Sequence, residues 1–268
     1  SQNIMSTVSD RDVVNLFYGF ISSPANIPAD ENGEEYKDKI QKARHLIIGG
    51  EYDVNLKLDI QLEGYIKDFT QLTNINRSMS SDYDNEYIVE RGLAKGVDFL
   101  LKYKNKNLYI WTVYSLGIIE RFEDGNNYFP HFDRRHNVNL VSSYTFGKNN
   151  SWKADARWNL GSGFPFTQTQ GFYENIPFSD GINTDYTSEN GELEIVYAEL
   201  NQGRLPYYHR LDISLTKSIE INKNSTLEIT SSVTNAYNRE NIFYFNRIEH
   251  ERVNQLPILP SAGISLTF

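Results

Sequence analysis

The stretch SWKADARWNL, residues 151–160, separates into two sets of alternating residues. One set is apolar and has a tryptophan near each end, and the other is polar and has charges of both signs. The apolar set comprises Trp152, Ala154, Ala156, Trp158 and Leu160. The polar set comprises Ser151, Lys153, Asp155, Arg157 and Asn159. Because successive side chains of a strand point to opposite faces, this pattern predicts a strand with one apolar and one wet face.

The same period of two recurs along most of the chain, and it predicts strands rather than helices. The clearest alternation lies at residues 56–68, 97–103, 138–146, 211–216, 227–234 and 262–268. The segment around Trp111 is less regular, because both of its faces are largely apolar. The pattern therefore indicates an all-β chain with about nine or ten antiparallel strands.

The connections between these strands are of two kinds. Short connections rich in Asn and Lys lie at 104–107, 148–151 and 222–225, with another turn near residues 53–55. Long connections lie at 69–90, 121–133, 161–206 and 247–257. Asn tolerates the left-handed backbone angles of tight hairpin turns. Since short and long connections alternate, an up-and-down meander places all short turns at one edge and all long loops at the other.

The organisation predicted is one run of β-hairpins without a second domain. FDRRHNVNLV (132–141) and YYHRLDISLT (207–216) each follow a long loop and begin a strand with aromatic, Arg and His residues. Because the two segments share this order of features, the repeating unit is predicted to be a β-hairpin. Residues 1–42 are loop-rich with one candidate strand, VVNLFYGF. Residues 43–268 are expected to hold the barrel strands and their long outer loops.

The composition limits the class of protein. Hydrophobic residues make up 39% of the 268 residues, a low share for a globular domain. Aromatic residues reach 13%, a high share that a disordered chain would lack, so the composition favours a folded, strand-rich chain. The net charge of −9 argues against a nucleic-acid partner. The absence of cysteine excludes disulfides and thiolate metal sites. No apolar run is long enough for a transmembrane helix, and the N-terminus lacks the charged-then-apolar build of a signal peptide.

A soluble β-sandwich and a membrane β-barrel both show alternation, and three features favour the barrel. Its turns and loops segregate to opposite edges, whereas sandwiches mix loop lengths. Residues 56–68 and 207–219 are long enough to span a bilayer. Trp152 and Trp158 lie about 20 Å apart along one strand and would form a lipid-facing aromatic girdle. Lys or Arg facing lipid would cost about 2–4 kcal/mol, so the charged face is predicted to line the lumen.

Several stretches together resemble the C-terminal barrel part of TonB-dependent outer-membrane transporters, in the form common in the Bacteroidetes. They are GVDFLLKY, FDRRHNVNLVSSYTF, GSGFPFT, LPYYHRLDISLT, SVTNAYNRENIFY and LPILPSAGISLTF. The resemblance covers residues 43–268 and rests on the order and spacing of these stretches. The terminal LTF, with Ile264, Leu266 and Phe268 on one face, also resembles the signal read by the barrel-assembly machinery.

The resemblance implies a bacterial outer-membrane location and uptake of a nutrient such as a siderophore, an oligosaccharide or a peptide. Barrels of this family have about 22 strands and a plugged lumen, so nine or ten strands imply part of a barrel. The expected partners are outer-membrane lipid, the plug and remaining strands in cis or from another chain, TonB through that part, and a surface lipoprotein. The chain is then a fragment or one chain of a split barrel. The alternative is a non-transporting structural or scaffold subunit.

No pattern indicates an enzyme, a cofactor or a metal. His131 and His136 are five positions apart, which puts them on opposite faces of a strand, and two of the four residues between them are arginines, which repel a cation. Ser162 in GSGFP lacks the GxSxG elbow of a hydrolase. The loop GFPFTQTQGFYENIPF (163–178) mixes aromatics with amides, which suits a sugar or peptide ligand or, more simply, packing against neighbouring loops.

The two strand starts at 132–141 and 207–216 give the candidate ligand site. Alternation places Arg210 inward, places Asp133 and Arg135 inward, and places Arg134 and His136 outward. The simplest role of the inward arginines is ion pairing with Asp133, Asp155, Asp212 or plug carboxylates, at about 0–1 kcal/mol each where solvated. The sharper hypothesis is ligand contact, with aromatic side chains of the longest loop closing over the ligand. The candidate residues are Arg135, Arg210, Phe164, Phe166, Phe172 and Tyr173.

Overall fold

The computed structural model describes residues 41–75, 87–123, 126–175, 192–222 and 224–268. The described part is made of β-strands, turns and one short 3-10 helix, η2 (Lys148–Asn150). It holds no helix of the length and apolarity needed to cross a membrane. The candidate strand VVNLFYGF and the rest of residues 1–40 lie outside the described residues.

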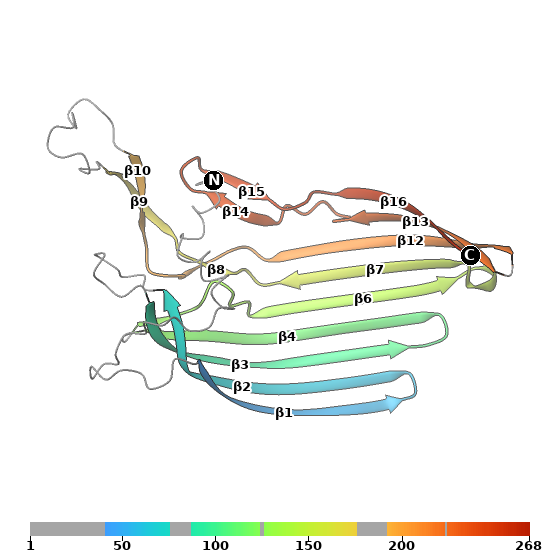
Figure 1. The fold of residues 1–268 in the computed structure, drawn as a ribbon, viewed down its shortest axis with the longest axis horizontal. Coiled ribbons are helices and arrows are strands. Elements are labelled where there is room, and N and C mark those ends of the chain that lie inside the picture. The colour runs from blue at the N-terminus through green and yellow to red at the C-terminus, as the bar shows by residue number, and fades with distance from the viewer. Residues whose placement is uncertain (1–40, 76–86, 124–125, 176–191, 223) are drawn as a thin grey trace.

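The main sheet is an antiparallel meander, which confirms the predicted fold class (Figure 1). Its order is β1-β2-β3-β4-β6-β7-β12-β13-β16, and the short β5 (Asn126–Tyr128) pairs with β4. The long strands are β1 (Lys42–Asn55), β2 (Leu58–Ile75), β3 (Tyr87–Lys104), β4 (Leu108–Glu123), β6 (His136–Phe146), β7 (Trp152–Gly161), β12 (Tyr208–Asn222), β13 (Ser225–Thr234) and β16 (Leu259–Thr267).

The short turns all lie at one edge of the sheet and the long connections at the other (Figure 1). Asn149 and Asn150 have φ angles of 55° and 52°, the left-handed conformation expected of the Asn-rich turns. Two predicted boundaries are wrong. The loop placed at 69–90 is shorter, because β2 continues to Ile75 and β3 begins at Tyr87. The last connection occupies 235–258 rather than 247–257, because Asn235, at φ 53°, turns the chain directly after β13.

Strand registers sort the side chains into the two predicted faces. On β7, Trp158 pairs with Leu140 of β6 and Leu211 of β12, so an apolar row crosses three strands. Asp155, on the opposite, polar face, pairs with Ser143 and Ser214. The five residues of the apolar set that begins at Trp152 therefore share one face, and the charged residues between them share the other. Stacking of Trp152 on Phe146, with ring centroids 6.2 Å apart, extends the apolar face to the turn edge.

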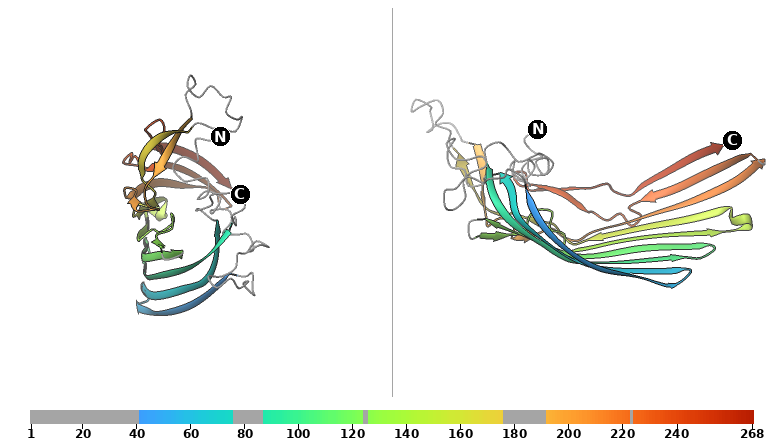
Figure 2. Two further views of the ribbon diagram at one scale, coloured as in Figure 1. Left: turned by 90° about the vertical axis from the view of Figure 1, so that its left-hand side faces the viewer. Right: turned by 60° about the horizontal axis from the view of Figure 1, so that its bottom comes forward.

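The main sheet, from β1 to β16, is the wall of the molecule. It is a single curved layer that stays open within the described residues (Figure 2). There β1 pairs with β2 alone and β16 with β13 alone. Ile48 and Ile264, on the apolar face, are 71% and 78% exposed. The buried hydrophobic residues of the described part are Leu72, Ala94 and Tyr128, too few for a conventional core. An amphipathic sheet has to cover its apolar face, so this wall needs an apolar surrounding or a second layer.

Candidate functional site

Three small two-stranded sheets lie in the long connections, at the loop end of the wall (Figure 1). They pair β8 (Pro165–Phe166) with β11 (Gly203–Arg204), β9 (Thr169–Asn175) with β10 (Glu192–Tyr197), and β14 (Ile242–Asn246) with β15 (Glu251–Asn254). Strands β8 to β11 all belong to the connection between β7 and β12. The predicted ligand residues fall among these segments and at the starts of β6 and β12.

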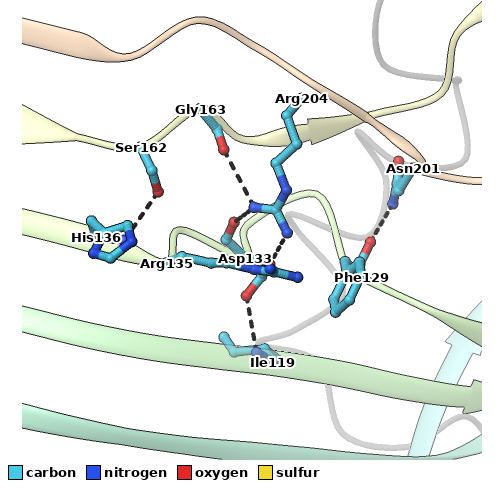
Figure 3. A network of polar contacts seen from close by, with 9 residues as sticks. All are labelled: Ile119, Phe129, Asp133, Arg135, His136, Ser162, Gly163, Asn201 and Arg204. Atoms are coloured by element: carbon cyan, nitrogen blue, oxygen red, sulfur yellow. Dashed lines mark hydrogen bonds and ion pairs between the residues drawn. The ribbon is translucent and has the colours of Figure 1, made fainter.

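Asp133 is the centre of a buried polar cluster at this end (Figure 3). Its side chain is 0% exposed, and Oδ1 accepts a hydrogen bond of 2.9 Å from the backbone N–H of Ile119 on β4. Arg204 of β11 donates to Oδ2 of the same carboxylate and, at 2.8 Å, to the Asp133 carbonyl. A fully buried carboxylate is tolerated only when it is paired and hydrogen-bonded, and here both of its oxygens have partners.

Arg135 completes the cluster from the other side. Its Nε lies 3.6 Å from Oδ2 of Asp133, and its guanidinium lies 4.6 Å from the centre of the Phe129 ring. Asn201 donates a 2.8 Å hydrogen bond to the carbonyl of Phe129. The cluster therefore joins the β5–β6 connection to residues just before β11, which are about 70 positions later in the chain. This long-range link holds the loops over the end of the sheet.

The two predicted inward arginines both make ion pairs with predicted partners. Arg135 pairs with Asp133 as described, and Arg210 contacts Oδ2 of Asp212 at 2.9 and 3.1 Å. Asn159 and Arg210 are register partners on the polar face, so Arg210 lies where alternation placed it. These contacts agree with the simpler of the two predicted roles. Ligand contact by either arginine stays a prediction.

The predicted aromatic residues contact separate partners rather than converging on one point. Phe164 lies under the Arg134 guanidinium at 4.1 Å, and Phe166 packs against Phe245 of β14 with centroids 6.3 Å apart. Further out, in the β9–β10 hairpin, Phe172 contacts His250 at 5.5 Å, and the Tyr173 hydroxyl donates to Glu194. That hydrogen bond is the main reason that the pKa of Tyr173 is raised. A lid that closes over a ligand stays a prediction for these four residues.

The predicted outward position of Arg134 is wrong. A Cβ built on Gly161 would lie 2.5 Å from the Arg134 guanidinium carbon. Gly161 pairs with Asn137 and Tyr208, which belong to the polar face, so Arg134 lies over that face too. The alternation fails here because β6 begins at His136, and residues before it form a turn with a 2.8 Å hydrogen bond from Asp133 N–H to the Pro130 carbonyl. His136 does lie on the apolar face, beside Tyr114 at 2.9 Å.

Arg204 and Asn201 are site residues that the sequence did not identify. Arg204 lies 71 positions after Asp133, and nothing in the local sequence GR distinguishes it from a solvated arginine. Asn201 has a φ angle of 56° and is buried, and only its left-handed conformation marks it as a turn residue. Among the described residues, no three His, Asp or Glu side chains gather in a way that could hold a metal ion.

The predicted assembly-signal residues lie at the opposite, short-turn end. Ile264 and Leu266 pair with Ile229 and Leu227 of β13 on the apolar face, and Phe268 follows them at 93% exposure. Thr267 pairs with Thr226, next to the turn between β12 and β13, so the strand ends at the short-turn edge. Recognition of these residues during assembly stays a prediction.

Comparison with solved structures finds chains with a similar fold. A chain in the structure of the FpvAI–pyocin S2 complex matches 90% of this chain with a TM-score of 0.55 and 13% identity. The outer-membrane transporter YddB from Escherichia coli matches 87% with a TM-score of 0.53 and 8% identity. The matched regions amount to 29% and 33% of those two chains. No family model matches this chain, and no curated protein matches it at a significant level.

Proposed function

We propose that this chain forms part of the barrel wall of a TonB-dependent transporter in the outer membrane of a bacterium, of the form common in the Bacteroidetes. The observation that carries the proposal is the arrangement of the sheet. Nine long strands form one antiparallel wall with an apolar and a polar face, short turns at one edge and long loops at the other. This is the arrangement of outer-membrane barrels, and the fold is similar to that of the transporter YddB.

The limits of the apolar face support a membrane location. On β12 the apolar row runs through Leu211, Ile213 and Leu215, with His209 before it, and Lys217 interrupts it before Ile219 and Ile221 near the turn. His209 and Lys217 are eight positions apart, or about 26 Å along the strand at about 3.3 Å per residue, which is about 20 Å of height for a strand tilted by about 40°. The apolar band of outer-membrane barrels is about 25 Å tall.

The side chains at both limits are arranged as residues of a membrane interface. At the turn end, Lys217 lies 4.8 Å from the Trp152 ring centre and donates a 2.7 Å hydrogen bond to Ser151. A lysine at a membrane boundary extends its ammonium group toward water in this way. At the loop end, His209 and the hydroxyl of Tyr237 lie 2.7 Å apart. We propose that Trp152 and Trp158 face lipid between these limits.

The proposed cargo is a nutrient too large for diffusion through porins, such as a siderophore, an oligosaccharide or a peptide. The role is passage and binding rather than catalysis. The long connections supply the surface that meets the cargo, because they carry the exposed aromatic residues Phe172, Tyr173 and Tyr197. The plug, the remaining strands, TonB and a surface lipoprotein are the proposed partners.

The test is energy-dependent uptake by cells. The gene is deleted and then restored, and the compounds removed from a complex medium are compared between the two strains by mass spectrometry. We expect at least one compound to be depleted by the restored strain alone, and depletion to stop when TonB is also removed. A protein that assembles in the outer membrane while both strains deplete the same compounds would contradict transport and favour a scaffold role.

A further inference from the structure

A cavity of about 410 Å³ lies beside Arg134 at the loop end of the wall. Besides Arg134, which precedes β6, its lining comes from three parts of the chain: the segment after β7, the segment that leads into β12, and the β14–β15 region with the residues just before it. These three parts of the chain are held together by the contacts described above and by the pairing of Leu205 N–H with the Phe164 carbonyl at 2.9 Å. The cavity is thus formed by ordered backbone from distant parts of the sequence.

Positive charge is in excess in this lining. It contains three arginines and one glutamate, and Arg252 is paired with that glutamate, Glu240. Within the described residues, neither Arg134 nor Arg239 makes an ion pair. Two uncompensated positive charges therefore face one cavity in a chain whose net charge is −9.

Arg134 carries a buried donor without a partner. Its Nε is shielded from solvent and donates no hydrogen bond to any described group. Arginine stays protonated in proteins, so this donor cannot be removed by loss of a proton. Burial lowers the pKa of Arg134 from its ordinary value, and no carboxylate opposes that effect. Because Nε is closed to a water-sized group, the donors of Arg134 that a ligand could reach are the terminal NH2 groups of the guanidinium.

Two aromatic rings lie close to the guanidinium of Arg134. Phe164 lies 4.1 Å and Tyr208 5.7 Å from the guanidinium carbon, measured to their ring centres. A guanidinium stacked on a ring still presents its N–H groups at the edge, in a planar fork that matches a carboxylate. Tyr207 and Phe243 also line the cavity and give it apolar walls.

We propose that this cavity binds the carboxylate of a ligand whose attached group is aromatic or aliphatic, with Arg134 as the main contact and Arg239 as the second. The singly charged, planar carboxylate is favoured because apolar walls penalise the burial of a more strongly hydrated dianion. The inference rests on the proposed transport function and gives its cargo a chemical class.

The experiment measures binding of benzoate to the purified protein, expressed from its complete gene and kept in detergent, by equilibrium dialysis. Benzyl alcohol, which has the same ring without the charge, is the matched probe. We expect benzoate to bind at least about tenfold more tightly than benzyl alcohol, and Arg134→Gln to weaken benzoate binding about tenfold or more. The same substitution should leave the binding of benzyl alcohol unchanged.

The control variant is Arg157→Gln, which removes an exposed arginine of the polar face that does not line the cavity. It should bind benzoate as the parent does, and heat-modifiable migration in electrophoresis should show that both variants are folded. Because the Arg134 variant could disturb its surroundings, Arg239→Gln is measured as well and should also weaken benzoate binding. Equal affinity of parent and arginine variants, or of the two probes, would overturn the inference.

Binding and uptake separate the two proposals. If uptake depends on TonB but benzoate does not bind, the transport proposal stands and the carboxylate site is wrong. If benzoate binds through Arg134 but no compound is taken up, the cavity binds a carboxylate as proposed while the proposed function fails.

Discussion

Charged side chains are solvent-exposed in the wall of the sheet, whereas the central charge of the loop end is buried and paired. In the wall, Lys153 and Asp155 lie 3.1 Å apart, with 51% and 30% of their side chains exposed. At the loop end, Asp133 is fully buried and contacts two arginines and a backbone N–H. Charged side chains of the wall are stabilised by water at the polar face, whereas the carboxylate of Asp133 is stabilised by its ion-pair and hydrogen-bond partners. The loop end should therefore be more sensitive to the loss of a single group.

The largest expected effect follows removal of the buried charge. Asp133→Asn leaves Arg204 and Arg135 without their shared carboxylate, and breaking a buried pair in this way costs about 3–5 kcal/mol. The matched control, Asp155→Asn, removes a solvated partner and should cost about 0–1 kcal/mol. Urea unfolding of the detergent-solubilised protein, followed by heat-modifiable migration, gives both values. Equal losses would remove the distinction between the two regions.

A charge on the apolar face of the wall should have the next largest effect. Ala156→Arg would place a guanidinium in the middle of the proposed lipid-facing band, at a cost of about 2–4 kcal/mol. Ser143→Arg, on the polar face of β6, is the control and should be tolerated. Both variants are compared by the amount of folded protein recovered from the outer membrane. Similar recovery of both would show that the two faces have similar surroundings.

Gly163→Ala tests how closely the loops approach one another. A Cβ at this position would lie 1.5 Å from the carbonyl oxygen of Leu205, so the backbone would have to move, at about 1–3 kcal/mol. At Gly161 the nearest atoms belong to the Arg134 side chain, which can move, so Gly161→Ala should cost less. The unfolding free energies of the two variants are compared, and Gly163→Ala is expected to be the less stable. The reverse order would contradict the close approach of the loops at Gly163.

The smallest effect is expected from Lys153→Ala in the wall. Its ion pair with Asp155 is half exposed, so its loss should change the unfolding free energy by at most about 1 kcal/mol. Added salt should reduce this difference further, because exposed charges are screened. A loss as large as that of Asp133→Asn would mean that the polar face is not wet.

The wall could be predicted from the sequence because its information is local. Alternation in SWKADARWNL assigns every side chain to a face from its neighbours alone, and Asn-rich turns mark where the chain reverses. The predicted faces, the turn edge and the meander all agree with the structure. The last connection was placed too late because the turn at Asn235 follows a strand whose end is not marked by Gly or Pro.

The loop end could not be predicted in the same way. Arg134 was assigned to the wrong face because alternation was extended past the beginning of β6, where the backbone is no longer a strand. The partner of Asp133, Arg204, comes from a two-residue strand 71 positions later, and one sequence does not show such pairing. The structure of the loop end is determined by burial and by contacts between distant parts of the chain, and neither produces a periodic pattern in the sequence.

The most direct test of the central claim is the solvent reached by alternate residues of β7. The chain contains no cysteine, so single cysteines can be introduced one at a time at positions 153–160 and labelled with a membrane-impermeant maleimide in isolated outer membranes. Because only a hydrated thiol forms the reactive thiolate readily, we predict labelling at 153, 155, 157 and 159 and little at 154, 156, 158 and 160. The reverse pattern, or equal labelling of both sets, would contradict a wall with one face in lipid and one in water.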